Sequence, residues 1–225
     1  MTNACVTTID LLRHGECEGG LIFRGHTDSA LSTKGQQQMQ QAIDAYPGQK
    51  AHWQQIISSP LQRCIVFAQQ LIDSQNNNAF LLLEPGLQEI SFGDWDGCLT
   101  EQVQQQQPAA VSNFWQNPAE HTPPNGELLT DFQQRVVHSW QQLVEQHRGE
   151  HSLLISHGGV IRIILAHILQ MPLRPLSYLS VPHACLTQIK IFHQAGSPDW
   201  PQLIFHQPLS SPDHLSSTLL SSTHS

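Results

Sequence analysis

Two histidines in this sequence each stand directly before a glycine, and an arginine precedes the first of them. His14 follows Arg13, and His157 lies far along the chain. A histidine ring nitrogen can act as a nucleophile or exchange a proton near neutral pH. The planar forks of Arg13 and Arg63 suit the oxygens of a phosphoryl group. These residue types favour phosphoryl transfer, in which fixed positive groups surround the transferred phosphate.

Both histidines come directly after apolar runs that are typical of buried strands. Val6 to Leu12 precedes Arg13-His14-Gly15, and Ser152 to Ser156 precedes the second histidine. Ligands of open α/β sheets bind at the carboxyl ends of the strands. The two histidines would therefore meet if the two strands are neighbours in the sheet.

Strands and helices alternate along the rest of the chain. Ser32 is expected to cap a helix, and Pro60 suits the first turn of another. The remaining expected elements are helices 32–45, 61–74, 127–147 and 160–169 and strands 56–57, 80–83, 185–192 and 203–206. Such alternation predicts an α/β fold, a three-layer α/β/α sandwich around a mostly parallel sheet.

The middle of the chain, residues 84–127, is irregular and is expected to form a small cap on a single domain spanning residues 1–207. It contains the glutamine run 104–107, which is interpreted as a solvated helix face or loop. Trp95 and Trp115 are expected to pack within this cap. Residues 208–225 are rich in serine and are expected to form a loose tail.

Charge and composition argue against some classes of binding partner. The formal net charge is -8, and the absence of a basic run disfavours nucleic-acid binding. No apolar run approaches the roughly 20 residues of a membrane helix, and residues 1–8 lack the features of a secretory signal. We therefore expect no membrane partner and a cytoplasmic location.

The cysteines and acidic residues suggest neither a disulfide framework nor a metal site. Five cysteines without a C-x-x-C pair are expected to stay reduced and non-catalytic. Glu16 and Glu18 lack a second cluster with ligand spacing. We expect no metal and no other cofactor.

Arg63 has an unusual place for a positive charge. It falls in the first turn of the expected helix 61–74, where the helix dipole disfavours a cation unless an anion is near. An ordinary surface role is therefore less favoured than anion binding.

Several motifs together resemble the histidine phosphatase superfamily, which includes the phosphoglycerate mutases. The resemblance covers roughly residues 6 to 170 and follows the family's order. The matching segments are Leu11-Leu12-Arg13-His14-Gly15-Glu16, Arg24-Gly25-His26-Thr27-Asp28, Ser58-Ser59-Pro60-Leu61-Gln62-Arg63, Leu87 to Gly97, and Ser156-His157-Gly158-Gly159.

This resemblance implies a phosphoglycerate mutase-like fold and specific roles. His14 would be the nucleophile that carries a covalent phosphate, with its other ring nitrogen donating to a backbone carbonyl. Arg13 and Arg63 would hold phosphoryl oxygens, and His157 would be a third donor. Glu89 would protonate the leaving oxygen.

Other positions are expected at the edge of the site. Arg24 and Gly158 join the predicted substrate-binding set, and Glu127 is expected to open a helix and to reach phosphate only through an intervening group. The roles of His26 and His183 are left open, although His183 follows Pro182 at the entry to a strand.

The resemblance implies a phosphomonoesterase acting on a small phosphorylated substrate. Pro124-Asn125-Gly126-Glu127 and Phe92 to Trp95 most resemble the alpha-ribazole phosphatases of cobalamin synthesis, which favours alpha-ribazole 5'-phosphate. Sugar phosphates, phosphoglycerates, phosphorylated proteins, a mutase-like phosphotransferase and a non-catalytic phosphate-binding module remain alternatives. Oligomeric state stays open, a dimer included.

Overall fold

The computed structural model describes residues 5–47, 52–75, 79–173 and 178–207, so the expected tail 208–225 lies outside the described residues. They contain a six-stranded sheet in the order β3-β2-β4-β1-β5-β6. The strands are β1 (Cys5–Arg13), β2 (Gln55–Ser58), β3 (Phe80–Leu83), β4 (His151–Ser156), β5 (Leu186–His193) and β6 (Trp200–Gln207).

The sheet is mostly parallel, as the alternation of elements predicted. β3 pairs with β2, β2 with β4, and β4 with β1, all in parallel. β5 pairs antiparallel with both β1 and β6, so β5 alone runs against the other described strands. The carboxyl ends of β1, β2 and β4 therefore lie at the same edge of the sheet.

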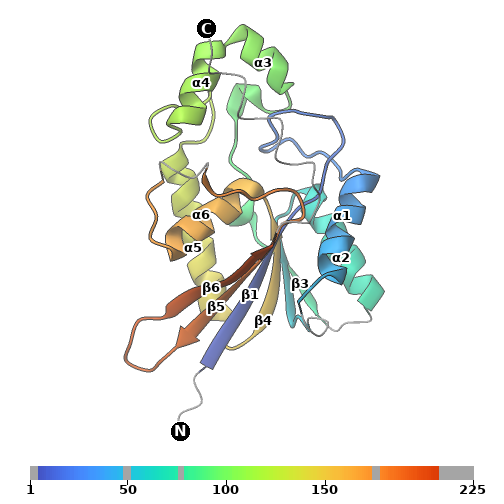
Figure 1. Ribbon diagram of the computed structural model, residues 1–225, viewed down its shortest axis with the longest axis vertical. Coiled ribbons are helices and arrows are strands. Elements are labelled where there is room, and N and C mark those ends of the chain that lie inside the picture. The colour runs from blue at the N-terminus through green and yellow to red at the C-terminus, as the bar shows by residue number, and fades with distance from the viewer. Residues whose placement is uncertain (1–4, 48–51, 76–78, 174–177, 208–225) are drawn as a thin grey trace.

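Helices cover both faces of this sheet (Figure 1): α1 and α2 lie on one face, and α5 and α6 on the other. The helices are α1 (Thr33–Asp44), α2 (Gln62–Gln75), α3 (Thr100–Gln106), α4 (Pro108–Gln116), α5 (Leu129–Gln146) and α6 (Gly158–Ile168), with 3-10 turns at Pro85–Leu87 and Gly93–Trp95. The three-layer α/β/α prediction is confirmed. No helix of the described residues is long and apolar enough to cross a bilayer.

Successive apolar residues of the central strands supply the two cores. Leu11 packs with α5 and α6, whereas Leu12 packs with α1 and α2. In β4, Leu154 likewise packs with α5 and α6, and Leu153 packs with α1 and α2. Neighbouring side chains of a strand point to opposite faces, so a continuous apolar run is what a sheet covered on both sides requires.

Helix starts follow local chemistry. The Ser32 hydroxyl accepts a hydrogen bond from the Gly35 N–H at 3.0 Å and caps α1, as expected. The helix expected to open at Glu127 instead begins at Leu129, with Leu128 in the capping position. Glu127 lies before the helix, and its carboxylate pairs with Arg135 at 2.6 Å.

The middle segment is more regular than predicted. It contains α3 and α4, of which α3 carries most of the glutamine run. Both lie beyond the carboxyl end of β1 in Figure 1. Trp95 is buried in a separate apolar cluster with Phe23, Val103, Val111 and Phe114. Trp115 stacks on Phe23 with ring centroids 6.4 Å apart but stays 57% exposed.

Candidate active site

The two motif histidines lie side by side because their strands are neighbours. Arg13 of β1 is in register with Ser156 of β4, and the His14 N–H donates to the Ser156 carbonyl at 2.9 Å. The His14 and His157 ring centroids are 5.3 Å apart. The sequence predicted that the two histidines meet if their strands are neighbours, and the order of the strands in the sheet meets this condition.

His14 is held through one ring nitrogen. Its Nδ1 lies 2.8 Å from the Gly15 carbonyl oxygen, which assigns the proton to Nδ1. Burial, and next the charge of Arg13, lower the pKa of His14 well below 6.5, so the ring is neutral at neutral pH. A neutral ring with Nε2 as its lone-pair nitrogen is the nucleophilic form.

His157 is fully buried and bonded at both ring nitrogens. Arg63 Nε lies 3.2 Å from Nδ1, and Nε2 lies 2.7 Å from Ser59 Oγ. Because the guanidinium can only donate, Nδ1 accepts and Nε2–H donates. Burial and the charge of Arg63 lower the pKa of His157 well below 6.5. Donation to a phosphoryl group would therefore require Nε2–H to leave or share Ser59.

Arg63 is buried at the start of α2 and is held by the loop that follows β1. Its Nη1 donates to Thr27 O at 2.8 Å and its Nη2 donates to Gly25 O at 2.7 Å. These carbonyl oxygens partly neutralise a cation that the helix dipole disfavours. They also fix the guanidinium beside His157.

Arg13 keeps an unused donor. Its Nη1 donates to Val181 O at 2.6 Å, whereas Nε is buried without a hydrogen-bond partner among the described residues. Burial, and next the charge of Arg162, lower the pKa of Arg13 to about 10, which leaves it charged at neutral pH. A Cβ at Gly158 would lie 3.2 Å from both Arg13 Nε and Arg162 Nη1. Glycine at this position therefore makes room for two arginines.

The structure also brings Glu89 to this cluster. Its carboxylate accepts from Ile90 N–H at 3.1 Å and from Gly159 N–H at 3.0 Å. The charges of Arg13 and Arg162 both interact with it. Glu89, His14 and Arg13 thus lie together beyond the carboxyl ends of β1 and β4.

Three predicted positions lie differently. Arg24 donates through Nη2 to Glu18 O at 2.8 Å and to Gly20 O at 2.9 Å, and its Nε is buried without a partner among the described residues. His26 is exposed. Glu127 is bound to Arg135 and not to this cluster, because Arg135 offers it a two-pronged ion pair.

His183 lies against the nucleophile, with ring centroids 5.7 Å apart. It is presented by a turn in which Cys185 N–H donates to Pro182 O, and Ala184 has the left-handed φ of 55°. Ala184 N–H also reaches His14 O at 3.3 Å. This turn fixes the entry to β5 beside the site.

Sequence reasoning missed Arg162, Ser59 and Arg135. Arg162 could have been found, because it stands four residues after Gly158 and therefore on the same face of the helix. Ser59 belongs to a recognised motif, but its bond to His157 depends on the neighbouring strand. Arg135 carries no local signal.

The cysteines and the Glu16 side chain have ordinary partners. Cys17 Sγ lies 3.6 Å from His14 Nδ1, and burial raises the pKa of its thiol. Burial likewise raises the pKa of Cys64. Glu16 pairs with Lys34 at 2.9 Å. No group of three or more potential metal-binding side chains occurs within the described ranges.

Comparison with known proteins identifies the class. Residues 9–200 match the model of the histidine phosphatase superfamily (branch 1), so the chain belongs to this family. It is a phosphatase with a phosphoglycerate mutase-like fold.

Individual relatives differ in their named activities. The chain is 27% identical to the adenosylcobalamin/alpha-ribazole phosphatase of Escherichia coli K12 over 80% of this chain and 88% of that protein. It is 28% identical to the 2,3-bisphosphoglycerate-dependent phosphoglycerate mutase of Bartonella henselae, over 70% and 79% respectively. The crystal structure of the alpha-ribazole phosphatase from Shigella flexneri is similar with a TM-score of 0.70 at 26% identity, covering 87% of this chain and 94% of that one.

Proposed function

We propose that the protein hydrolyses a phosphate monoester through a covalent phosphohistidine on Nε2 of His14. The observation that carries this proposal is the bond between His14 Nδ1 and the Gly15 carbonyl. That bond places the proton on Nδ1 and leaves the Nε2 lone pair for attack. Burial keeps the ring neutral, because it lowers the pKa of His14 well below 6.5.

The first step transfers the phosphoryl group to the enzyme. His14 Nε2 attacks phosphorus, an N–P bond forms, and the bond from phosphorus to the ester oxygen breaks. Glu89 gives its proton to that oxygen, which leaves as an alcohol. As an acid Glu89 must hold a proton when substrate binds, and a phosphate dianion beside the carboxyl favours that form.

The second step returns the enzyme to its starting state. Water attacks phosphorus opposite the N–P bond, and the Glu89 carboxylate accepts a proton from it. The N–P bond breaks, inorganic phosphate leaves, and His14 is again neutral. The same carboxyl group thus serves as acid and then as base.

Arg13 and Arg63 are proposed to hold the phosphoryl oxygens in both steps. The unpartnered Arg13 Nε supports this assignment, since a buried N–H without a partner is costly unless a ligand satisfies it. His157 is proposed as a further donor, and the Gly158 N–H at the first position of α6 is proposed to bind a phosphoryl oxygen. Arg24 is proposed to contact the substrate through its unpartnered Nε.

Alpha-ribazole 5'-phosphate is the proposed substrate. The proposal draws support from the alpha-ribazole phosphatases among the relatives and from the motif Pro124-Asn125-Gly126-Glu127. The mutase relative makes phosphoglycerates the alternative that must be tested alongside it.

The deciding experiment measures phosphate release from alpha-ribazole 5'-phosphate, phosphoglycerates, sugar phosphates and phosphopeptides. His14→Ala is the inactive control. We expect selective turnover of alpha-ribazole 5'-phosphate and an acid-labile phosphoenzyme when the wild type is quenched during turnover. His14-dependent turnover of another ester would change only the substrate assignment. Turnover by His14→Ala would end the phosphohistidine mechanism.

A further inference from the structure

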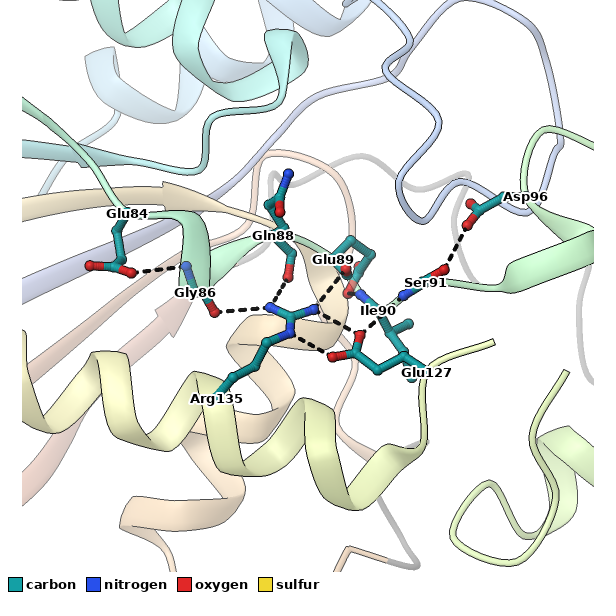
Figure 2. A network of polar contacts seen from close by, with 9 residues as sticks. All are labelled: Glu84, Gly86, Gln88, Glu89, Ile90, Ser91, Asp96, Glu127 and Arg135. Carbon is teal, nitrogen blue, oxygen red and sulfur yellow. Dashed lines mark hydrogen bonds and ion pairs between the residues drawn. The ribbon is translucent and has the colours of Figure 1, made fainter. Parts of the chain in front are cut away.

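The Arg135 side chain of α5 donates hydrogen bonds to the backbone of the loop that carries Glu89 (Figure 2). Its Nη1 donates to Gly86 O at 2.9 Å and to Gln88 O at 2.8 Å, and its Nη2 donates to Glu89 O at 3.0 Å. Nε and Nη2 also bind the two oxygens of Glu127, at 2.6 and 2.9 Å. One side chain therefore connects α5 to the backbone on both sides of residue 88.

These contacts use the full donor capacity of the guanidinium. Arginine has five N–H groups in a planar fork, and Arg135 makes five hydrogen bonds. A lysine has a single donor atom and cannot span the same acceptors. The geometry is therefore specific to arginine and not only to a positive charge.

Glu127 binds the backbone of the same loop on the other side of Glu89. Its Oε2 accepts from Ser91 N–H at 3.2 Å, so the Arg135 and Glu127 pair holds the peptide groups before and after Ile90. The pair is only partly exposed, with 26% and 17% of the two side chains accessible. Such a pair is less screened than a surface pair and fixes geometry more firmly.

The same loop is tied to the phosphate side of the site. Asp96 accepts from Phe92 N–H at 2.9 Å and from Gly25 N–H at 2.7 Å. The Gly25 carbonyl in turn accepts from Arg63. Hydrogen bonds therefore run from the loop of Glu89 to the arginine beside His157.

We propose that the Arg135 and Glu127 ion pair is the positioning element for Glu89 as the general acid. The inference rests on the proposed function, because it presumes that Glu89 protonates the leaving oxygen. The Glu89 carboxylate accepts hydrogen bonds from the backbone N–H groups of Ile90 and Gly159, so its place follows the backbone. A shift of about 1 Å in a catalytic group can cost on the order of 10²-fold in rate.

The choice of leaving group separates positioning from general structural support. An alkyl alcohol leaves poorly as an anion and needs the proton of Glu89, whereas nitrophenolate leaves without one. Misplacing Glu89 should therefore slow formation of the phosphoenzyme from alkyl phosphates and spare its formation from p-nitrophenyl phosphate. A loss of folded protein would reduce both equally.

The experiment compares Arg135→Lys and Glu127→Gln with Glu89→Gln on both kinds of ester. The alkyl ester is the best one that the wild type hydrolyses in the substrate panel. Both network variants should lower kcat/KM for it by about 10- to 100-fold, with nearly unchanged kcat/KM for p-nitrophenyl phosphate, as in Glu89→Gln. The ratio kcat/KM is the readout because it covers the steps up to loss of the leaving group and not the later attack of water, in which Glu89 acts as the base. Arg148→Lys, an exposed arginine beyond the end of the same helix, is the matched control and should behave as wild type.

Each of the other outcomes would contradict either the acid role of Glu89 or the positioning role of the ion pair. If Glu89→Gln shows no dependence on the leaving group, the acid assignment in the proposed function fails, and this inference fails with it. If Glu89→Gln shows the dependence but the network variants slow both esters equally, or neither, only the positioning role is overturned. Glu127→Gln keeps the shape and an acceptor oxygen, so it tests the idea even if Arg135→Lys unfolds.

Discussion

Arg13 and Arg135 lie in two regions of the molecule that differ in how far the N–H donors of an arginine are used by the protein. Arg135 gives five hydrogen bonds to the protein. Arg13 donates to Val181 O, and its Nε is buried without a partner within the described residues. A buried donor left unpaired costs about 1 to 3 kcal/mol, which a bound oxyanion would recover. The first arrangement is a scaffold, and the second is prepared for a ligand.

The comparison implies that variants in the two regions should fail differently. Changes around Arg13 and His14 should remove chemistry or phosphate binding while the fold persists. Changes around Arg135 should act through the place of Glu89, as argued above.

Removing the nucleophile is expected to have the largest effect. His14→Ala should lower kcat by roughly 10⁴- to 10⁶-fold on every ester, activated or not, because no other group forms the phosphoenzyme. Rapid-quench labelling should find no phosphoenzyme in this variant. Residual labelling would place the phosphate elsewhere and would break the distinction between the two regions.

Replacing Arg13 by lysine should lower kcat/KM by about 10²- to 10³-fold. Lysine keeps the charge but loses the Nε donor that has no protein partner. Unlike Arg135→Lys, this variant should slow p-nitrophenyl phosphate as much as an alkyl ester, since both carry the same phosphoryl group. Steady-state kinetics on the two esters measures the difference, and equal profiles for the two arginine variants would contradict it.

The histidines of the site were predictable because each follows a strand. Val6 to Leu12 and Ser152 to Ser156 are apolar enough to be recognised as strands, and parallel strands place their carboxyl ends together. What the sequence could not supply was the adjacency of β1 and β4. That adjacency is a property of the whole sheet, and it decides that His14 and His157 meet.

The network around Arg135 was not predictable for a similar reason. Three of its acceptors are backbone carbonyls that lie 46 to 49 residues away and have no residue type to recognise. Glu127 was predicted at the edge of the site, but its partner Arg135 depends on how α5 passes the loop of Glu89. α3 and α4 were also missed, since their apolar residues pack in a separate small cluster with Phe23.

Inorganic phosphate should stabilise the wild type through the site. At 100 times its Kd a ligand raises the free energy of unfolding by about 2.7 kcal/mol. The shift in Tm should disappear in Arg13→Met and persist in Arg135→Lys, because the latter does not bind the phosphoryl group. Thermal unfolding in sodium chloride at matched ionic strength provides the control. Equal shifts in both variants would show that the anion binds elsewhere.

The smallest expected effect is a loss of stability at mildly acidic pH. Burial lowers the pKa of His14 and His157 well below 6.5 in the folded state, whereas both regain ordinary pKa values when unfolded. The unfolded chain therefore binds more protons, and the free energy of unfolding falls as pH drops below about 6.5. Between pH 7 and about pH 5.5 each histidine should cost about 1 kcal/mol.

Chemical denaturation at both pH values measures this cost. His14→Gln should remove about half of the part due to this pair, whereas His138→Gln, at an exposed position of α5, is the matched control. The direction in which the free energy of unfolding changes with pH is what tests the charge state of the histidines. If His14→Gln left the pH dependence unchanged, the ring would have to bind its proton equally in both states. The neutral nucleophile, and with it the contrast between a site prepared for an anion and a satisfied scaffold, would then lose its electrostatic basis.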